Sequence, residues 1–140
     1  NNQIDVLEEK LNEAIKLDPK NPSLYQALAN VYDKKGKTDE AFHMYDKAIE
    51  VKPDYFEAYY NKAILYFNKA MEIVEKMNEE NDNKKYEILK TQREALLKDK
   101  ALPLLEKAYK LSPKDENVIK ALKEVYARLE MFDEMKQLGK

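Results

Sequence analysis

The chain lacks the residues on which several classes of protein depend. Its 140 residues include no cysteine, no tryptophan, only two glycines and one histidine. Without cysteine there are no disulfides, thiolate metal sites or thiol nucleophiles, and the separated Gly36 and Gly139 cannot form a phosphate-binding loop. His43 has no second histidine with which to bind zinc, and we interpret it as a surface residue. The sequence therefore predicts no catalytic residue, no metal and no cofactor, and a protein that is not an enzyme.

Charge and hydropathy exclude two kinds of partner. The formal net charge is −2, and the basic residues form only short pairs such as Lys34-Lys35 and Lys84-Lys85, so we expect no nucleic-acid binding. No apolar run approaches the roughly 20 residues that cross a bilayer, so we expect no membrane insertion in this segment. With 44% hydrophobic and 37% charged residues, the composition suits helices that bury one face and expose the other.

A recurring pattern of apolar and small residues ends in proline. Pro19 and Pro53 lie 34 residues apart, which is the period of a repeat made of two helices. The residues of this pattern are Tyr25, Leu28, Ala29 and Tyr32, followed by Ala41, Tyr45, Ala48 and Pro53. They fall where the tetratricopeptide repeat has W-x2-L-G-x2-Y, A-x3-F and P, and the chain resembles that family. The resemblance implies an all-α, right-handed solenoid of antiparallel helix pairs, with one repeat whose two helices are lengthened.

The same pattern, partly altered, predicts how the chain is organised. We expect one solenoid domain over 1–140, and a chain that opens inside a repeat looks like a fragment. Its parts are the second half of a repeat (1–19), a complete repeat (21–54), an enlarged repeat (55–114) and a truncated last repeat (115–140). The residues that carry these matches are Leu7, Leu11, Ala14, Tyr59, Ala63, Tyr66, Ala101, Leu105, Ala108, Pro113, Ile119, Leu122 and Tyr126.

The third repeat contains an insertion. Pro113 follows Pro53 by 60 residues, which is one period plus 26. Residues 68–100 contain no proline or glycine, and the only turn signal lies between Asn78 and Asn83. We therefore expect both helices to be lengthened into a helical hairpin that projects from the solenoid. Its eight basic and eight acidic residues are interspersed, which favours a solvated surface over a site for a polyanion.

Several residues are predicted to begin, end or bend helices. Gly36 is expected to end a helix, and Asn21 and Asp115 are expected to cap helix starts through their side-chain oxygens. Thr38 is expected to cap the next helix. Pro103 has two interpretations: a kink in the returning helix at the root of the hairpin, or the first turn of an ordinary repeat helix.

The candidate binding site follows from the resemblance. In tetratricopeptide repeats the first helix of each repeat lines the concave wall, which implies that an extended or helical peptide binds there. Amides on this wall can bond a peptide backbone, and Tyr60 and Phe67 can hold a side chain. In a second interpretation Ile64 and Phe67 only pack against the hairpin. The candidate residues are Gln26, Asn30, Asp33, Tyr60, Asn61, Ile64, Phe67, Lys120 and Glu124.

A more specific site of the same family was tested against the sequence. Some co-chaperones with these repeats bind a C-terminal carboxylate through two asparagines and several basic residues. Asn30 and Asn61 match the asparagines. The expected basic positions hold Gln26, Asn117 and Ala121 instead. Without cations the carboxylate loses the charge-assisted hydrogen bonds that would bind it, so the sequence favours a different ligand.

Three functional hypotheses follow. The first is a non-enzymatic scaffold that binds a protein or peptide on its concave face, on the projecting hairpin or on both. The second is a structural role in assembly, in which the hairpin and the open ends of the solenoid mediate self-association, with Leu96 and Leu97 required for it. The third is an accessory repeat segment of a larger envelope protein, enzyme or transporter. Richness in Asn, Lys and Tyr resembles repeat proteins of Bacteroidetes-type bacteria, many of which carry an export signal, and this resemblance favours the periplasm or cell envelope over the cytoplasm.

Overall fold

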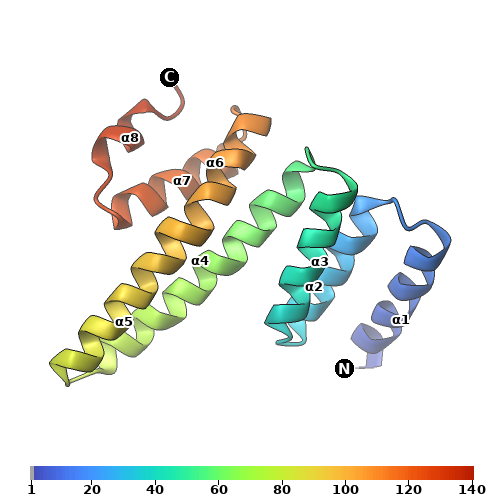
Figure 1. Cartoon of the computed structure of the whole chain (residues 1–140), viewed down its shortest axis with the longest axis horizontal. Helices are drawn as coiled ribbons and strands as arrows, with labels where there is room; N and C mark the ends of the chain where they lie inside the picture. Colours follow the sequence, from blue (N-terminus) through green and yellow to red (C-terminus); the bar gives the residue numbers. More distant parts are fainter. Residues whose placement is uncertain (1) are drawn as a thin grey trace. The chain divides into compact units, whose positions relative to one another are not determined.

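The computed structural model describes residues 2–140 of the chain, and these fold into helices without any strand (Figure 1). The all-α class predicted from the sequence is confirmed. The elements are α1 (Asn2–Leu17), α2 (Pro22–Lys34), α3 (Thr38–Val51), α4 (Phe56–Glu79), α5 (Asn83–Ala95), the π-helical η1 (Leu96–Ala101), α6 (Leu102–Leu111), α7 (Glu116–Arg128) and α8 (Phe132–Gln137).

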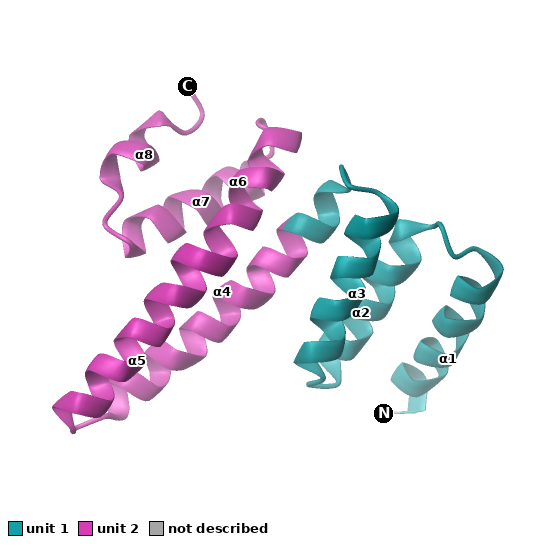
Figure 2. Cartoon of the chain, in the orientation of Figure 1, with its two compact units in different colours: residues 1–59 teal, residues 60–140 magenta. Residues whose placement is uncertain are grey.

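The helices form two compact units, shown in separate colours in Figure 2. Unit 1 comprises residues 1–59 and contains α1, α2, α3 and the first turn of α4. Unit 2 comprises residues 60–140 and contains the rest of α4 and all later helices. The division of the chain into repeats within one solenoid domain stays a prediction.

The core of unit 1 joins α2 to α3 through small residues. Ala29 on α2 and Ala48 on α3 are fully buried, which lets the two helices approach closely. The larger Leu28 and Tyr45 are 2% and 3% exposed and fill the space around this contact. The alternation of small and large side chains in the sequence pattern thus becomes the packing of one helix pair.

The turns that contain Pro19, Pro53 and Pro113 are closed by the same backbone hydrogen bond. The N–H of Asn21 donates to the carbonyl of Asp18 at 3.3 Å, and the N–H of Tyr55 donates to Lys52 at 3.0 Å. In unit 2 the N–H of Asp115 donates to Ser112 at 3.1 Å. The turn between a second helix and the next first helix therefore recurs, although 60 residues separate the last two examples.

A tyrosine six residues after the proline stabilises two of these turns. The hydroxyl of Tyr25 donates to the carbonyl of Pro19 at 2.8 Å, and the hydroxyl of Tyr59 donates to Pro53 at 2.7 Å. Both contacts lie in unit 1 and are one period apart. The equivalent residue in the last repeat is Ile119, which has no hydroxyl and cannot form the bond.

Two of the three predicted helix caps are present. The side-chain oxygen of Asn21 accepts from the N–H of Ser23 at 3.1 Å, and that of Asp115 accepts from Val118 at 3.0 Å. Thr38 was wrongly predicted to cap α3, because it is already the first helical residue and no side chain caps that helix.

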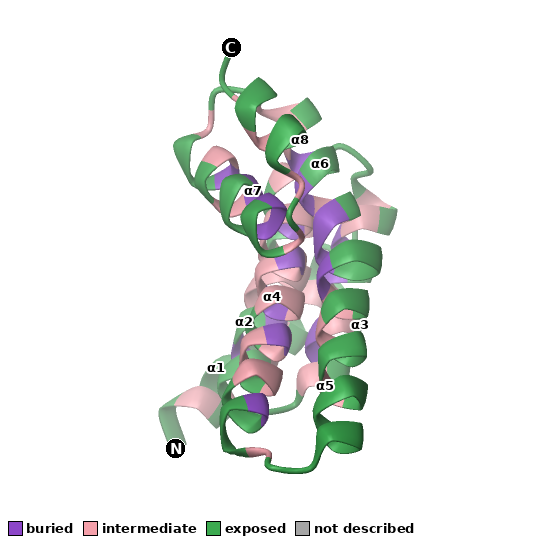
Figure 3. Cartoon of the chain, turned by 90° about the vertical axis from the view of Figure 1, so that its left-hand side faces the viewer, coloured by how far each residue is buried: buried purple, intermediate pink, exposed green. Residues whose placement is uncertain are grey.

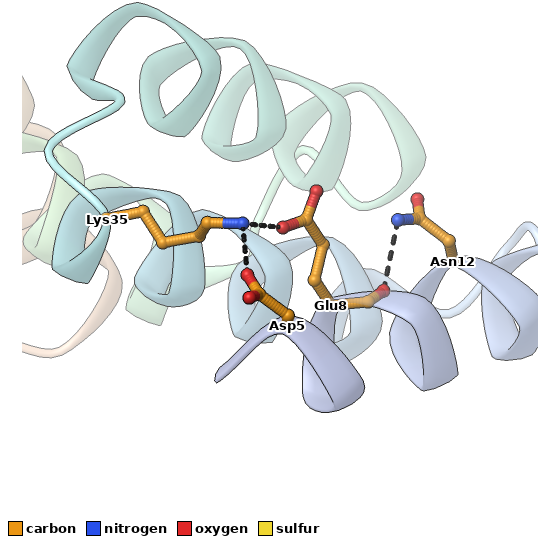
Figure 4. A network of polar contacts seen from close by, with 4 residues as sticks. All are labelled: Asp5, Glu8, Asn12 and Lys35. Atoms are coloured by element: carbon orange, nitrogen blue, oxygen red, sulfur yellow. Dashed lines mark hydrogen bonds and ion pairs between the residues drawn. The ribbon is translucent and has the colours of Figure 1, made fainter. Parts of the chain in front are cut away.

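A lysine joins α1 to the end of α2. The ammonium of Lys35 lies 2.8 Å from a carboxylate oxygen of Asp5 and also binds Glu8, as Figure 4 shows. Hydrogen bonding to Lys35 and its charge hold the pKa of Asp5 below its usual value. The amide of Asn12 continues the network by donating to the carbonyl of Glu8 at 3.0 Å (Figure 4). Because α1 has no buried residue, these polar contacts help to fix its orientation on α2.

The two longest helical stretches of the described residues are α4 and the segment that follows it from α5 to α6. Helix α4 has 24 residues, whereas its counterpart α2 has 13. The returning segment is helical from Asn83 through η1 to Leu111, whereas its counterpart α3 has 14 residues. The side chain of Asp82 caps α5 by accepting from the N–H of Lys85 at 3.0 Å. Helix α5 has no buried residue, and Figure 3 colours most of it as exposed.

The helix continues through the region of Pro103 with altered hydrogen bonding. Ala101 and Leu102 keep helical dihedrals, so the backbone stays helical where η1 ends and α6 begins. The N–H of Leu102 donates to the carbonyl of Leu97, five residues back, in place of the usual four. Pro103 has no backbone N–H to donate the next hydrogen bond of an α-helix. The π turn that precedes it accommodates this missing donor. Pro103 lies in the first turn of α6, as the second interpretation predicted, and the kink of the first interpretation stays a prediction.

Helices α2 and α7 end in the same kind of turn but with different residues in the left-handed conformation. In α2 this residue is Gly36, with φ +74°, and the N–H of Lys37 donates to Tyr32 at 2.8 Å. In α7 it is Glu130, with φ +59°, and the N–H of Met131 donates to Tyr126 at 2.8 Å. Glu130 therefore carries the steric strain that glycine avoids.

Substitutions at the two turns are expected to act in opposite directions. Gly36→Ala should lower the free energy of unfolding by about 1 kcal/mol, because a side chain in the left-handed region costs that amount. Glu130→Gly should raise the free energy of unfolding, because it removes the strain. The gain should be smaller than about 1 kcal/mol, since glycine also gains more conformational entropy on unfolding, which offsets part of it. Urea unfolding of both variants is the measurement. Equal destabilisation by both changes would contradict this account of the turns.

Candidate functional site

A groove in unit 2 lies between α4 and α7. Four side chains from α4 form one wall, at spacings of four, three and four residues that place them on one face of the helix. These residues are Tyr60, Ile64, Phe67 and Met71. The wall is therefore largely apolar and aromatic, which suits an apolar side chain of a ligand.

Helix α7 forms the opposite wall and α6 contributes Leu105. Leu105 is fully buried, so the groove is lined in part by the core of unit 2. The α7 wall is mainly polar and consists of Asn117, Lys120, Ala121, Glu124 and Arg128. The groove has a volume of about 390 Å³, which accommodates one or two large side chains rather than a whole domain.

Of the three charged residues that the structure describes on the α7 wall, two form an ion pair with each other and the third does not. Arg128 donates from Nε to a carboxylate oxygen of Glu124 at 2.9 Å, and the two residues form an ion pair. The guanidinium of Arg128 also lies 5.7 Å from the ring centre of Phe67, within the range of a cation–π interaction. Among the described residues Lys120 makes no ion pair, so the groove contains one positive charge without a partner.

Tyr60 lies at one end of the apolar wall in a partly desolvated position. Burial raises the pKa of its hydroxyl above the ordinary value, and the nearby negative charge of Asp115 adds to the effect. The hydroxyl is therefore neutral at physiological pH and can act as a hydrogen-bond donor, while the ring contributes to the apolar wall.

The structure brings together five of the nine residues predicted for the concave face. Tyr60, Ile64, Phe67, Lys120 and Glu124 all line the groove of unit 2. Asn61 lies on the same helix as three of them but does not line the groove. Their role in binding stays a prediction.

The other three predicted residues lie on α2 in unit 1. The side-chain oxygen of Asn30 accepts a hydrogen bond from the hydroxyl of Tyr45 at 2.7 Å, so this atom already has a partner. The side-chain oxygen of Gln26 is buried without a hydrogen-bond partner. Asp33 is exposed. Asn30 is exposed as well, whereas Gln26 is partly buried.

Sequence reasoning missed five residues of the groove. Asn117 and Ala121 occupied positions where basic residues were sought, and Leu105 was assigned only to the core. Met71 could have been found, because it continues the helical spacing of Tyr60, Ile64 and Phe67. Arg128 similarly lies four residues after Glu124, at the spacing of a helical ion pair.

The hairpin has its own exposed apolar surface. Tyr86 and Ile88 on α5 are 39% and 57% exposed. Further along, Ile73 and Leu96 line a shallow depression together with Ala95. The prediction that Leu97 contributes to a self-association surface was wrong, because Leu97 is fully buried in unit 2. Its replacement would disturb the core rather than an interface.

Comparison with protein families matches the first part of the chain. Residues 10–43 match the family described as Tetratricopeptide repeat, and residues 30–69 match the family described as TPR repeat. The resemblance predicted from the sequence is thereby confirmed over these residues, as is the TPR-type fold class. Tetratricopeptide repeats generally mediate protein–protein interactions and typically form non-enzymatic scaffolds.

The described residues contain neither a metal-binding cluster nor a membrane-spanning helix. Within residues 2–140 no group of three or more acidic or histidine side chains is placed to hold a metal ion. No helix in the described part of the chain is long and apolar enough to cross a membrane. His43, the only histidine, is exposed on α3.

Proposed function

We propose that the chain is a non-enzymatic scaffold that binds a segment of another protein in the groove between α4 and α7. The partner segment inserts a bulky apolar side chain against the Tyr60–Met71 face of α4 and carries a carboxylate near Lys120. The observation that supports this proposal is the combination of an apolar wall with one unpaired cation in the same groove.

The apolar wall provides most of the free energy of binding in this proposal. Burying a large aliphatic or aromatic side chain contributes about 1.5–3 kcal/mol. The polar wall determines orientation, because the amide of Asn117 and the ammonium of Lys120 can bond the backbone and a carboxylate of the partner. Glu124 and Arg128 already neutralise each other and are less available.

Peptide selection tests the chemistry of the partner. A display library of random peptides is selected against the full chain, and the enriched sequences are expected to combine a large apolar residue with Asp or Glu within a few positions. Affinity for one enriched peptide is then measured by fluorescence anisotropy. Enrichment of basic peptides, or of peptides without apolar residues, would contradict the proposal.

Two matched pairs of variants test the place of binding. Ile64→Ala should weaken binding about tenfold, whereas Ile73→Ala, a partly buried isoleucine of the same helix outside the groove, should leave it unchanged. Lys120→Gln should weaken binding several-fold, unlike Lys123→Gln, another exposed lysine on α7. If Ile73→Ala were the damaging change, the hairpin would carry the binding and the groove assignment would be wrong.

Self-association is the second candidate function. The exposed Tyr86 and Ile88 and the depression at Ile73 and Leu96 favour it. Sedimentation over a range of concentrations distinguishes the two functions, because a self-associating chain gains mass on concentration and Ile88→Lys would reduce that gain. The resemblance to repeat proteins of Bacteroidetes-type bacteria leads us to propose a place in the periplasm or cell envelope.

A further inference from the structure

A second pocket of unit 2 is surrounded by charged side chains. It has a volume of about 410 Å³ and lies between the α5–η1 segment and the turn from α7 to α8. Apart from Leu129 and Met131, its lining consists of four basic residues and two acidic ones. These are Lys90, Arg93, Lys98 and Arg128, with Glu94 and Glu130.

The chain has only two arginines, and both line this pocket. Arg93 belongs to α5 and Arg128 to the end of α7, so residues 35 positions apart converge there. Arginine is suited to oxyanions because its planar guanidinium presents several donors in a fixed arrangement. The remaining 23 basic residues are lysines, so the two arginines are concentrated in this pocket.

The guanidinium of Arg93 has unused hydrogen-bonding capacity. Its Nε is buried and has no hydrogen-bond partner. Among residues 2–140 its only ion pair is a long one, 3.5 Å from Nη2 to the carboxylate of Glu94. The side chain as a whole is 22% exposed, so other atoms of it reach the pocket surface. The donors that an oxyanion in the pocket can reach are therefore those of the Arg93 guanidinium other than Nε.

Two departures from regular backbone border the same pocket. Glu130 adopts the left-handed conformation that glycine has at the equivalent turn of α2. Lys98 lies in the π-helical turn η1. Both features cost free energy, and such irregularities are frequent at binding sites. Neither Lys90 nor Lys98 makes an ion pair among the described residues.

We propose that this pocket binds a phosphate group, held by Arg93 together with Lys90, Lys98 and Arg128. Four basic side chains supply more donors than the two oxygens of a carboxylate can accept, whereas a phosphate offers at least three oxygens. Because Arg128 is also bonded to Glu124, Arg93 and the two lysines provide the main positive charge. The pocket shares Arg128 with the proposed peptide groove, but Lys90, Arg93 and Lys98 do not line that groove, so phosphate binding to them can fail without affecting peptide binding.

Nuclear magnetic resonance of the full chain tests this proposal directly. Sodium phosphate is titrated into the ¹⁵N-labelled protein at constant ionic strength, and the Nε–H signals of the two arginines are followed. A saturable shift of the Arg93 signal, accompanied by the backbone amides of Glu130 and Met131, is expected. Absence of a saturable shift would overturn the proposal, as would equal affinity for acetate.

Variants separate a phosphate site from general charge attraction. Arg93→Lys retains the charge but loses the guanidinium, and should weaken phosphate binding about tenfold. Lys98→Gln should weaken it several-fold, whereas Lys84→Gln, which removes an exposed lysine outside the pocket, should have no effect. Equal losses for Lys98→Gln and Lys84→Gln would show that net charge alone is responsible and would refute the site.

The source of the phosphate group is distinguished by a second ligand. A short peptide with one phosphoserine is titrated in the same way, with its unphosphorylated form as the control. Tighter binding of the phosphoserine peptide than of inorganic phosphate identifies a phosphorylated protein as the source, and the reverse order identifies a free phosphate compound. If neither the peptide nor inorganic phosphate shifts the Arg93 signal, the site is refuted.

Discussion

Tyr45→Ala is expected to lower the free energy of unfolding by about 3–5 kcal/mol, in line with the removal of a large buried aromatic side chain. Tyr45 is 3% exposed and fills the space beside the fully buried Ala29 and Ala48 in the α2–α3 pair. Its hydroxyl also donates to Asn30 at 2.7 Å, and this bond is lost with the ring. Urea unfolding followed by circular dichroism provides the measurement.

Tyr45→Phe is the control, because it keeps the ring and removes only the hydrogen bond. It should cost about 1 kcal/mol, since Asn30 is exposed and can bond to water after the change. A cost as large as that of Tyr45→Ala would show that the hydrogen bond, rather than packing, holds the helix pair together.

The pH dependence of unfolding gives a second check on Tyr45. Burial, assisted by the charge of Asp33, raises the pKa of its hydroxyl from 10.0 to about 12 in the folded chain. A raised pKa means that the stabilising contribution is complete below pH 10 and is lost as the pH rises towards 12. The wild-type chain should therefore lose more stability over this interval than Tyr45→Phe.

Leu105→Ala should destabilise unit 2 by about 2–5 kcal/mol, because Leu105 is fully buried and its truncation leaves a cavity. The same residue contacts the groove between α4 and α7, so the change also enlarges the proposed peptide site. We expect weaker peptide binding together with a lower urea midpoint.

Leu104→Ala is the matched control for Leu105. Leu104 is the preceding leucine of α6 and is only partly buried, so its truncation should cost about 1 kcal/mol and leave the groove intact. Equal effects of the two changes would show that α6 does not contribute to the core in the way described. Loss of peptide binding in Leu104→Ala alone would place the ligand outside the groove.

The repeat pattern predicted local structure well where a residue acts on its own helix or turn. The caps at Asn21 and Asp115 and the helix end at Gly36 depend on backbone geometry within a few residues. Thr38 was the exception, because α3 begins one residue earlier than the cap prediction requires. Glu130 was not recognised as the counterpart of Gly36, since its side chain gives no sign of a left-handed conformation.

The groove was only partly predicted, because only one of its walls follows from the residue spacing of a single helix. The α4 wall follows from the helical spacing of Tyr60, Ile64 and Phe67, which a single helix determines. The choice of residues on α7 depends on how that helix rotates against α6, which the sequence pattern does not specify. The repeat pattern predicted that Leu105 is a core residue. Its contact with the groove could not be predicted, because it depends on how the helices of unit 2 pack together.

By itself the sequence determined the period, the helices, the small-residue contacts and the absence of cysteine chemistry, because each depends on residue type and spacing along one element. The tertiary structure decided which charges meet. The interspersed charges of residues 68–100 cancel when counted along the chain, yet folding brings Arg93 and Lys98 beside Arg128. Electrostatic sites depend on distances between elements, and those distances arise only when helices remote in sequence pack together.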